Sequence, residues 1–396
     1  MPDSRPGPWL RLTAIAAAGA VTIAVVSGAA GLGTAHRLLA ALALPPIVAL
    51  VVATWTYHRR LLPATLAALG LFAGAALVTP KTLHLVLAGL ALSAIVAATA
   101  LSVRAGPAPF GSWRDYVALT KPRIMTLLLL TGFCGMVAGA RGLPAAHVAV
   151  AAMLGLALAC GGASAINHVL DRDIDRLMGE RTQARPVAAG RLAPGHALEF
   201  GLALSACSFT LLAGTVNVLT ASLALVGNLF YVIVYTRWLK RTTAQNIVIG
   251  GAAGAVPPLV GWAAATGDVT LSAIFLFLIV FFWTPPHFWA LALLIKRDYA
   301  AAGVPMLPVV RGERETTRQI VLYSLALVGI SLLPVAWGYS GWGYLAAALL
   351  LGAWFLLLAW RLRGETTPRR AAGLFHYSLA YLAALFVAVA LDAAFL

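Results

Sequence analysis

The sequence predicts an all-α membrane protein with about thirteen transmembrane helices, and three observations favour that fold class. The 396 residues are 61% hydrophobic and 10% charged, which lies outside the usual composition of soluble globular proteins. Apolar runs of roughly 18 to 25 residues recur along the chain, and each is long enough to cross a bilayer as a helix. The positively charged residues gather in alternate loops, as they do in membrane proteins with a fixed orientation.

The thirteen expected spans follow one another with short loops between most of them. They lie at residues 11–33, 37–57, 62–79, 83–103, 123–140, 145–167, 195–214, 218–236, 246–264, 270–294, 319–338, 343–360 and 373–394. If residue 1 is inside, 25 of the 28 Lys and Arg fall in inner loops, and only Arg37, Lys81 and Arg141 lie outside. We therefore expect a multi-pass protein of the cell's inner (plasma) membrane. Its net charge of +15 is expected to reflect its orientation in the lipid bilayer, and no binding to nucleic acid is expected.

The first four spans form a block over residues 1–104. His36 and His84 each begin a span, and two histidines on the helices of a four-helix bundle suit a bis-imidazole heme site. The layout weakly resembles one four-helix half of heme A synthase, which makes that enzyme a candidate partner. A heme-binding module, a degenerate remnant of one and an unrelated scaffold all remain open for this block.

Residues 105–122 form a linker and an amphipathic entry to a nine-helix domain over residues 123–396. Two long loops of this domain, 168–194 and 295–318, lie on the inner side, whereas its outer loops are only a few residues long. Long polar loops on one face indicate where a membrane protein carries out its chemistry. The active-site loops are therefore expected to face the cytoplasm.

A cluster of acids follows the sixth span, in a chain with only 13 Asp and Glu. Asn167, Asp171 and Asp175 are spaced i, i+4, i+8, which places them on one stripe of a helix. Asp173 points away from that stripe and suits a surface ion pair. Carboxylate and amide oxygens are ligands for Mg²⁺, which commonly binds through one or two carboxylates together with substrate phosphate oxygens.

Basic residues come directly after these acids, at Arg181, Arg185 and Arg191. Guanidinium groups bind anionic oxygens well. Acidic residues that bind a metal, beside basic residues that bind phosphate oxygens, are suited to a metal-bound diphosphate. On these residues alone, a helix end carrying solvated charges remains an alternative.

Four stretches of the nine-helix domain resemble the UbiA-type intramembrane prenyltransferases, in the form typical of the branch that farnesylates protoheme IX. They are NHVLDRDIDRLMGERTQARP at 167–186, YTRWLKRTTAQNIVIGGAAGAVPPLVG at 235–261, WTPPHFW at 283–289 and DYAAAGVPMLP at 298–308. The resemblance covers roughly residues 113–394. It implies nine helices around a cavity that opens to lipid. It also implies that farnesyl diphosphate is bound through Mg²⁺ and that its farnesyl group passes to a vinyl group of protoheme IX, giving heme O.

The resemblance assigns roles to particular residues. Asn167, Asp171 and Asp175 match the first metal-binding and catalytic set, and Asp298 is the candidate for the second. The second motif departs from the general pattern of paired acids, because Asp298 is preceded by two cations. The candidate diphosphate-binding residues are Arg181, Arg185, Arg237, Lys240, Lys296 and Arg297.

Two proline pairs lie inside expected spans. Pro257-Pro258 is expected to kink or break its helix, and Pro285-Pro286 to interrupt another just before the mouth. His287 follows that second pair and is a candidate heme contact, although a purely structural histidine is equally compatible with the sequence. A prenyltransferase acting on a quinone-precursor ring, and a heme or isoprenoid transporter without catalysis, are the competing functions.

Overall fold

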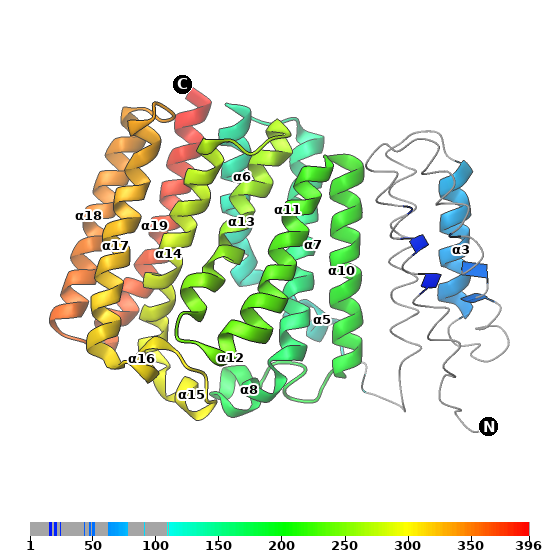
Figure 1. The fold of residues 1–396 in the computed structure, drawn as a ribbon, viewed down its shortest axis with the longest axis horizontal. Coiled ribbons are helices and arrows are strands. Elements are labelled where there is room, and N and C mark those ends of the chain that lie inside the picture. Colours follow the sequence, from blue (N-terminus) through cyan, green and yellow to red (C-terminus); the bar gives the residue numbers. More distant parts are fainter. Residues whose placement is uncertain are drawn as a thin grey trace.

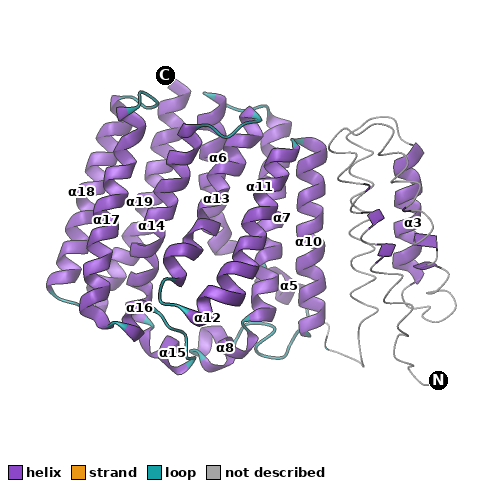
Figure 2. Ribbon diagram, viewed as in Figure 1, coloured by secondary structure: helices purple, strands orange, loops and turns teal. Residues whose placement is uncertain are grey.

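The computed structural model of the protein describes residues 62–77, 109 and 111–395, together with single positions between 16 and 91. In these residues the regular structure is helical, and Figure 2 shows helices and loops but no strand among them. The expected all-α class is thus confirmed for the part of the chain that the structure describes.

Nine helical spans in the described residues are long and apolar enough to cross a membrane. They stand side by side in Figure 1, with the C-terminus at the upper end. Their bounds are α6 (Pro122–Ala140), α7 (Ala146–Leu170), α10 (Pro194–Thr215), the continuous α11 (Val218–Leu229), η2 (Phe230–Leu239) and α12 (Lys240–Thr242), α13 (Asn246–Thr266), α14 (Leu271–Leu294), α17 (Gly312–Ala336), α18 (Trp342–Gly364) and α19 (Pro368–Phe395). The expectation of nine spans from residue 123 onward is confirmed.

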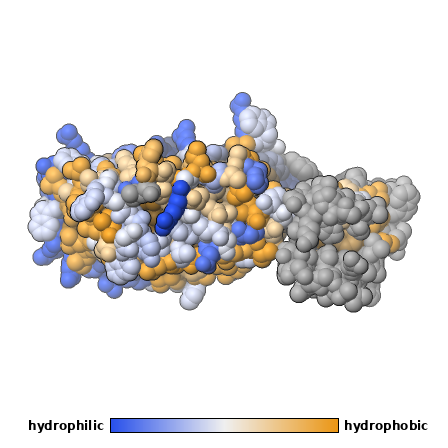
Figure 3. Space-filling view, turned by 90° about the horizontal axis from the view of Figure 1, so that it is seen from above, coloured by the Kyte–Doolittle hydropathy of each residue, from blue (hydrophilic) through white to orange (hydrophobic). Residues whose placement is uncertain are grey.

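Short helices gather at one end of this bundle, the lower end in Figure 1. They are α5 (Trp113–Leu119), α8 (Arg172–Leu177), α9 (Glu180–Gln183), α15 (Lys296–Ala301) and α16 (Leu307–Val310), and with α12 they define what we call the short-helix end. Figure 3 looks at the opposite end, where few strongly hydrophilic residues lie among hydrophobic ones. The charged stretches 171–185 and 296–318 instead belong to the short-helix end.

The bundle closes because α14 packs against α13, α17 and α19, while α19 also packs against α6. Helices α6 and α13 cross especially closely, and glycines make this possible. A Cβ added at Gly135 would lie 2.6 Å from the backbone oxygen of Pro258, and one at Gly261 would overlap the carbonyl oxygen of Gly132. Small residues at such crossings let helix backbones touch. This contact fixes α13 in the bundle, beside the π-helical segment η2.

The two proline pairs do not break their helices, so the expected interruption at Pro285-Pro286 is wrong. Helix α13 runs through Pro257-Pro258 and α14 runs through Pro285-Pro286. All four prolines are buried, and α13 and α14 pack against each other. Tertiary packing on both sides can hold a helix together where proline removes a backbone hydrogen bond.

Only part of the amino-terminal block is described. Helix α3 (Leu62–Leu77) belongs to this block, and its Ala68, Phe72 and Ala75 share one apolar core with Val21 and Ile47 from earlier segments. The other helices expected before residue 104, and with them the total of thirteen spans, lie mostly outside the described residues. The candidate heme ligands His36 and His84 also lie outside them.

Candidate active site

The acidic stripe lies at the short-helix end, where α7 passes into α8. Asp171 is the junction between the two helices, with φ −91° and ψ 3°. The backbone N–H of Asp171 still donates to Asn167 O at 2.9 Å, and that of Asp175 to Asp171 O at 2.8 Å. These i to i+4 bonds preserve the predicted stripe across the junction. Asn167, Asp171 and Asp175 are only 3%, 0% and 1% exposed.

Three cations from different elements donate hydrogen bonds to this buried row, and a fourth, Arg241, lies 3.9 Å from Asp171 Oδ1. Lys240 of α12 donates to Asp171 Oδ2 at 2.5 Å, and Arg185 of the loop after α9 pairs with Asp175 Oδ1 at 2.7 Å. Lys121, just before α6, donates to Asn167 Oδ1 at 2.9 Å. Each aspartate of the row is therefore paired with a cation in an enclosed place, and the surplus of positive charge suits an anionic ligand bound through a metal.

The amide and carboxylate oxygens of this row fit a hard divalent cation. Asp171 Oδ1 and Asp175 Oδ2 are both buried without a hydrogen-bond partner, and a buried polar atom without a partner calls for a water, ion or ligand. Within the described ranges no three His, Cys, Asp or Glu side chains come together as a metal site. Oxygen donors of this kind are ligands for Mg²⁺, which completes its shell with substrate oxygens and water.

Burial shapes the protonation of the groups around this row. It raises the pKa of Asp175, against the opposing pull of the Arg185 guanidinium. Burial also lowers the pKa of Lys121 to about 7, helped by the positive charges of Arg185 and Lys240 and opposed by Asp171 and Asp175. Burial and the nearby positive charges thus destabilise the charged form of Lys121. An anion that binds beside it would stabilise that form.

Asp298, the candidate from the second loop, is close to the first loop. A Cβ built on Gly179 would lie 2.7 Å from Asp298 Oδ2, so the carboxylate packs directly against the backbone that follows α8. Its neighbour Tyr299 is partly buried, and burial raises the pKa of its phenol to about 12. The two long loops separated in the sequence therefore meet at one mouth, with Asp298 facing the first motif.

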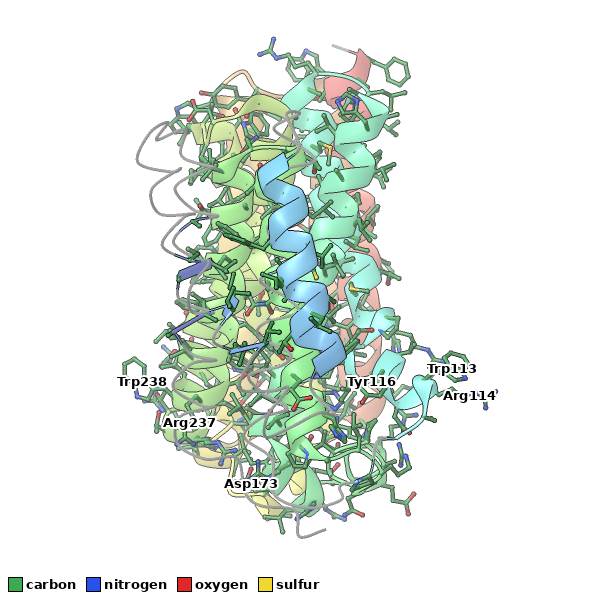
Figure 4. The ribbon with its side chains drawn as sticks, turned by 90° about the vertical axis from the view of Figure 1, so that its right-hand side faces the viewer. Trp113, Arg114, Tyr116, Asp173, Arg237 and Trp238 are labelled. Carbon is green, nitrogen blue, oxygen red and sulfur yellow. The ribbon has the colours of Figure 1, made fainter. Side chains whose placement is uncertain are left out.

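The structure does not bring all the predicted basic residues to the acidic row. Arg237 is exposed, and in Figure 4 it points outward beside Trp238, on the flank opposite to Trp113 and Arg114. Lys296 donates to Glu313 Oε1 at 3.2 Å instead of facing the acids. Exposed aromatic and cationic side chains at this height are typical of a membrane interface.

Arg181 and Arg297 are exposed at the same end, and the structure gives neither a partner within the row. Of the six basic candidates, Arg185 and Lys240 alone contact an aspartate of the first motif. These two residues come from different segments, so the sequence pattern could not separate them from their neighbours.

Asp173 is separate from the buried row, as its position in the sequence predicts. It forms two hydrogen bonds of 2.7 Å with Arg241, which hold the pKa of its carboxyl well below the usual range. Its partner is not the adjacent Arg172, which bonds to the carbonyl of Val169 at 3.4 Å. Asp173 and Arg241 line a hollow of about 240 Å³ together with Ile174, Leu177 and residues 302–304.

His287 is buried within α14, between the rings of Trp283 and Phe375, whose centroids lie 4.3 and 4.8 Å away. Its Nδ1 lies 2.7 Å from Ser378 Oγ, and that hydroxyl donates to the carbonyl of Phe375. The hydroxyl proton is thus already used, so Nδ1 carries the proton and donates to Ser378. Nε2 then holds a lone pair that could bind a ligand.

Two residues of the site were not predicted from the sequence. Lys121 occurs in a Thr-Lys-Pro-Arg run that looks like ordinary loop cations, and its left-handed φ of 51° aims it at Asn167. Thr236 accepts a hydrogen bond from Asn167 Nδ2 at 3.1 Å. It belongs to η2, a π-helix, and no pattern in the sequence marked that local winding.

The comparison with known families identifies the fold that this site belongs to. The model of the UbiA prenyltransferase family matches residues 128–388, which is 261 of the 396 residues. The chain belongs to the UbiA prenyltransferase family. It is accordingly a prenyltransferase and a multi-pass membrane protein, and its described nine-helix bundle is the family's fold.

Relatives and solved structures agree with that assignment. This prenyltransferase is 55% identical over 281 residues to a protein from Symbiobacterium thermophilum named protoheme IX farnesyltransferase, covering 70% of this chain and 94% of that one. A protein of the same name from Roseiflexus is 44% identical over 414 residues, covering 93% of this chain and 77% of the relative. A UbiA homologue from Archaeoglobus fulgidus, solved with DMAPP and Mg²⁺, shares the fold with a TM-score of 0.56 at 20% identity, covering 69% of this chain and 99% of that one.

Proposed function

We propose that this prenyltransferase transfers a farnesyl group from farnesyl diphosphate to a vinyl group of protoheme IX, giving heme O and diphosphate. The observation that carries the proposal is the enclosed row Asn167–Asp171–Asp175 with Arg185 and Lys240 on it, in a chain whose relatives at 44% to 55% identity are named for this reaction. Such a row can bind a metal ion, and the metal and the cations together would neutralise the negative charge of the diphosphate as it leaves the farnesyl group.

The bond between the allylic carbon of the farnesyl group and the diphosphate oxygen breaks, and diphosphate departs with the electron pair. The terminal vinyl carbon of protoheme IX forms a bond to that allylic carbon. Water then adds to the other vinyl carbon and loses a proton, which leaves a hydroxyethylfarnesyl group.

The first-motif residues would hold the metal that the family's chemistry implies. Asn167, Asp171 and Asp175 offer buried oxygens along one helical stripe, and Asp298 of the second loop packs against Gly179 in the first loop. A bound Mg²⁺ would neutralise charge on the departing diphosphate and so lower the barrier to its release. The Archaeoglobus structure with DMAPP and Mg²⁺ supports this assignment by its ligands and its fold.

Lys240, Arg185 and Lys121 are the cations best placed to take the diphosphate oxygens. Lys240 and Arg185 pair with the two aspartates of the row, and Lys121 donates to the amide oxygen of Asn167, so all three lie beside the proposed metal ligands. Preorganised cations stabilise negative charge where it develops. Arg181 and Arg297, exposed at the same end, would form the outer part of this clamp.

His287 would contact the porphyrin through Nε2, as a ligand of its iron. It lies seven residues before the end of α14, about 10 Å deeper than the mouth at the helical rise of 1.5 Å per residue. Charged propionates are better accommodated near the interface, so the iron is the part of heme that suits this depth. In the His287→Ala variant, the visible spectrum of added heme should lose the features of a histidine-bound iron.

The short-helix end would face the cytoplasm of a cell with this protein in its plasma membrane. The bias of 25 Lys and Arg toward that side supports the orientation. Water-soluble diphosphate is then released where it can be consumed.

Incubation of the purified full chain with protoheme IX, farnesyl diphosphate and Mg²⁺, followed by mass analysis of the porphyrin, tests the proposed function. Heme O is the expected product, and chelation of Mg²⁺ should stop its formation. A quinone-precursor ring offered as the acceptor separates the proposal from its nearest rival. If heme is moved but never alkylated, the chain is a transporter and the proposal is wrong.

A further inference from the structure

The span Val218–Thr242 contains an unusual stretch of backbone beside the active site. Ten residues, Phe230–Leu239, are wound as the π-helix η2 between α11 and α12. π-Helical turns are rare and occur mostly as single turns at functional sites. The stretch is held by packing, because the ring of Tyr235 fills the place where a side chain at Gly250 of α13 would stand. Its position is therefore fixed from outside as well as by its own hydrogen bonds.

Thr236 is the residue of η2 that touches the acidic row. It is fully buried, and its Oγ1 accepts a hydrogen bond from Asn167 Nδ2 at 3.1 Å. Asn167 Nδ2 also donates to Asp171 Oδ2 at 2.7 Å. Both N–H groups of the amide are thus used by acceptors on one side. The amide oxygen alone is left for positive charge, and Lys121 occupies that position here at 2.9 Å.

The partners of this amide differ in what ligand binding would do to them. Lys121 and Asp171 carry charges, and both belong to the group that a divalent cation and a diphosphate would rearrange. Thr236 is neutral, lies on a packed helix and makes no ion pair. It can therefore keep hold of the amide while the charged partners change places.

We propose that Thr236 is a positioning residue that holds the Asn167 amide with its oxygen toward the cation site. The inference rests on the proposed function in one respect, namely that Asn167 is a cation ligand. Groups that orient metal ligands commonly change metal affinity by about 10- to 100-fold when they are removed. This role also accounts for the π-helical winding of η2. Thr236 contacts Asn167, and Lys240, which directly follows η2, contacts Asp171.

The test measures Mn²⁺ binding to the purified full chain by electron paramagnetic resonance, without substrates. Thr236→Val should weaken Mn²⁺ binding by about 10-fold or more, and Thr236→Ser, which keeps the hydroxyl, should stay within about 3-fold of the wild type. The matched control is Thr131→Val, because Thr131 is equally buried but bonds to the carbonyl of Leu128 in its own helix. That variant should bind Mn²⁺ normally.

A double-mutant cycle with Asn167→Asp separates positioning from general disruption. An aspartate at 167 has no amide to orient, so Thr236→Val should cause little further loss in that background. An equal loss in both backgrounds overturns the inference. Thr236→Ala replaces the valine variant if valine prevents folding, since alanine removes the hydroxyl without adding bulk to η2.

The outcomes also distinguish the inference from the proposed function. If the wild type binds Mn²⁺ and forms heme O while folded Thr236→Val binds Mn²⁺ equally well, the positioning role alone is wrong. If the wild type binds no Mn²⁺ and forms no heme O, both fail. If product forms in the absence of any divalent cation, Asn167 is not a cation ligand and Thr236 has nothing to position.

Discussion

At the scale of single residues, Asp171 and Asp173 offer a matched pair of carboxylates two positions apart. Asp171 is fully buried and bonded to Lys240, whereas Asp173 is exposed and bonded to Arg241. We expect Asp171→Asn to lower the rate of heme O formation by about 10²-fold or more, as expected when a charge that stabilises a transition state is lost. Asp173→Asn should stay within a few-fold of the wild type, because its surface ion pair adds little.

The measurement for this pair is the initial rate of heme O formation by both variants under saturating Mg²⁺. Both proteins should first be shown to have wild-type thermal midpoints, because removal of a buried charge can unfold a protein. Equal activity of the two variants would show that the buried row does not act in catalysis.

The ammonium group of Lys121 gives the protein a pH dependence whose sign follows from its pKa. Its folded-state pKa is about 7, below the ordinary value of 10.5, so the folded protein holds fewer protons than the unfolded chain between these values. The stability of the metal-free wild type relative to Lys121→Met should therefore rise from about pH 7 to 10.5 and be constant outside that window.

Thermal midpoints of wild type and Lys121→Met, recorded side by side at pH 6.5, 8 and 9, test this pH dependence. The difference between the two proteins should shift in favour of the wild type as the pH increases. A difference that stays constant across these pH values would mean that Lys121 is solvated in the folded protein.

At the scale of helices and loops, the sequence predicted the spans well and the local interruptions poorly. Apolar length is a property of the segment itself, so α6 and α14 begin and end within a residue of their predicted limits. Helix α17 starts at Gly312, seven residues before the predicted 319, because its first turns are polar and extend beyond the apolar run. The proline pairs of α13 and α14 and the winding of η2 depend on neighbouring helices, which no single segment reveals.

The residues of the site likewise divide into those predictable from one segment and those that depend on contacts between segments. The spacing of Asn167, Asp171 and Asp175 was enough to place them on one stripe, since it depends on one helix. Arg185 and Lys240 could be selected from the other cations only when loops distant in the sequence were brought together. Lys121 was missed for the same reason.

The contact between the two long loops leads to a prediction about Gly179. Its φ of −60° permits alanine, but the added Cβ would lie 2.7 Å from Asp298 Oδ2 and push the carboxylate aside. Displacement of a catalytic group by about 1 Å can cost about 10²-fold in rate. Gly179→Ala should thus lower the rate of heme O formation at least 10-fold without a large change in thermal midpoint.

The control for Gly179→Ala is Gly373→Ala in α19, where an added Cβ meets nothing within 4 Å. That variant should retain wild-type activity, and alanine suits the helix better than glycine. If Gly179→Ala is as active as Gly373→Ala, the placement of Asp298 against the first loop does not matter for the reaction.

At the scale of the whole molecule, the amino-terminal block and the nine-helix domain differ in how widely relatives share them. The alignment with the Symbiobacterium protein covers 94% of that protein but only 70% of this chain. Almost the whole of that relative therefore corresponds to one part of this chain. The Roseiflexus alignment covers 93% of this chain. Residues 105–396 make up only about 74% of it, so that alignment must extend into residues 1–104. The Roseiflexus relative thus matches part of residues 1–104, whereas only about 6% of the Symbiobacterium protein lies outside its match.

We therefore expect a chain shortened to residues 105–396 to insert in the membrane and to form heme O within a few-fold of the full-length rate. The closed ring of α6, α13, α14 and α19 and every contact of the acidic row come from residues after 120, so removal of the block leaves them intact. Heme O formation and the heme content of both proteins should be measured together. A shortened protein that keeps its thermal midpoint but makes no heme O would show that the block takes part in the reaction. Retained activity with a lower heme content would instead assign it a role in heme binding.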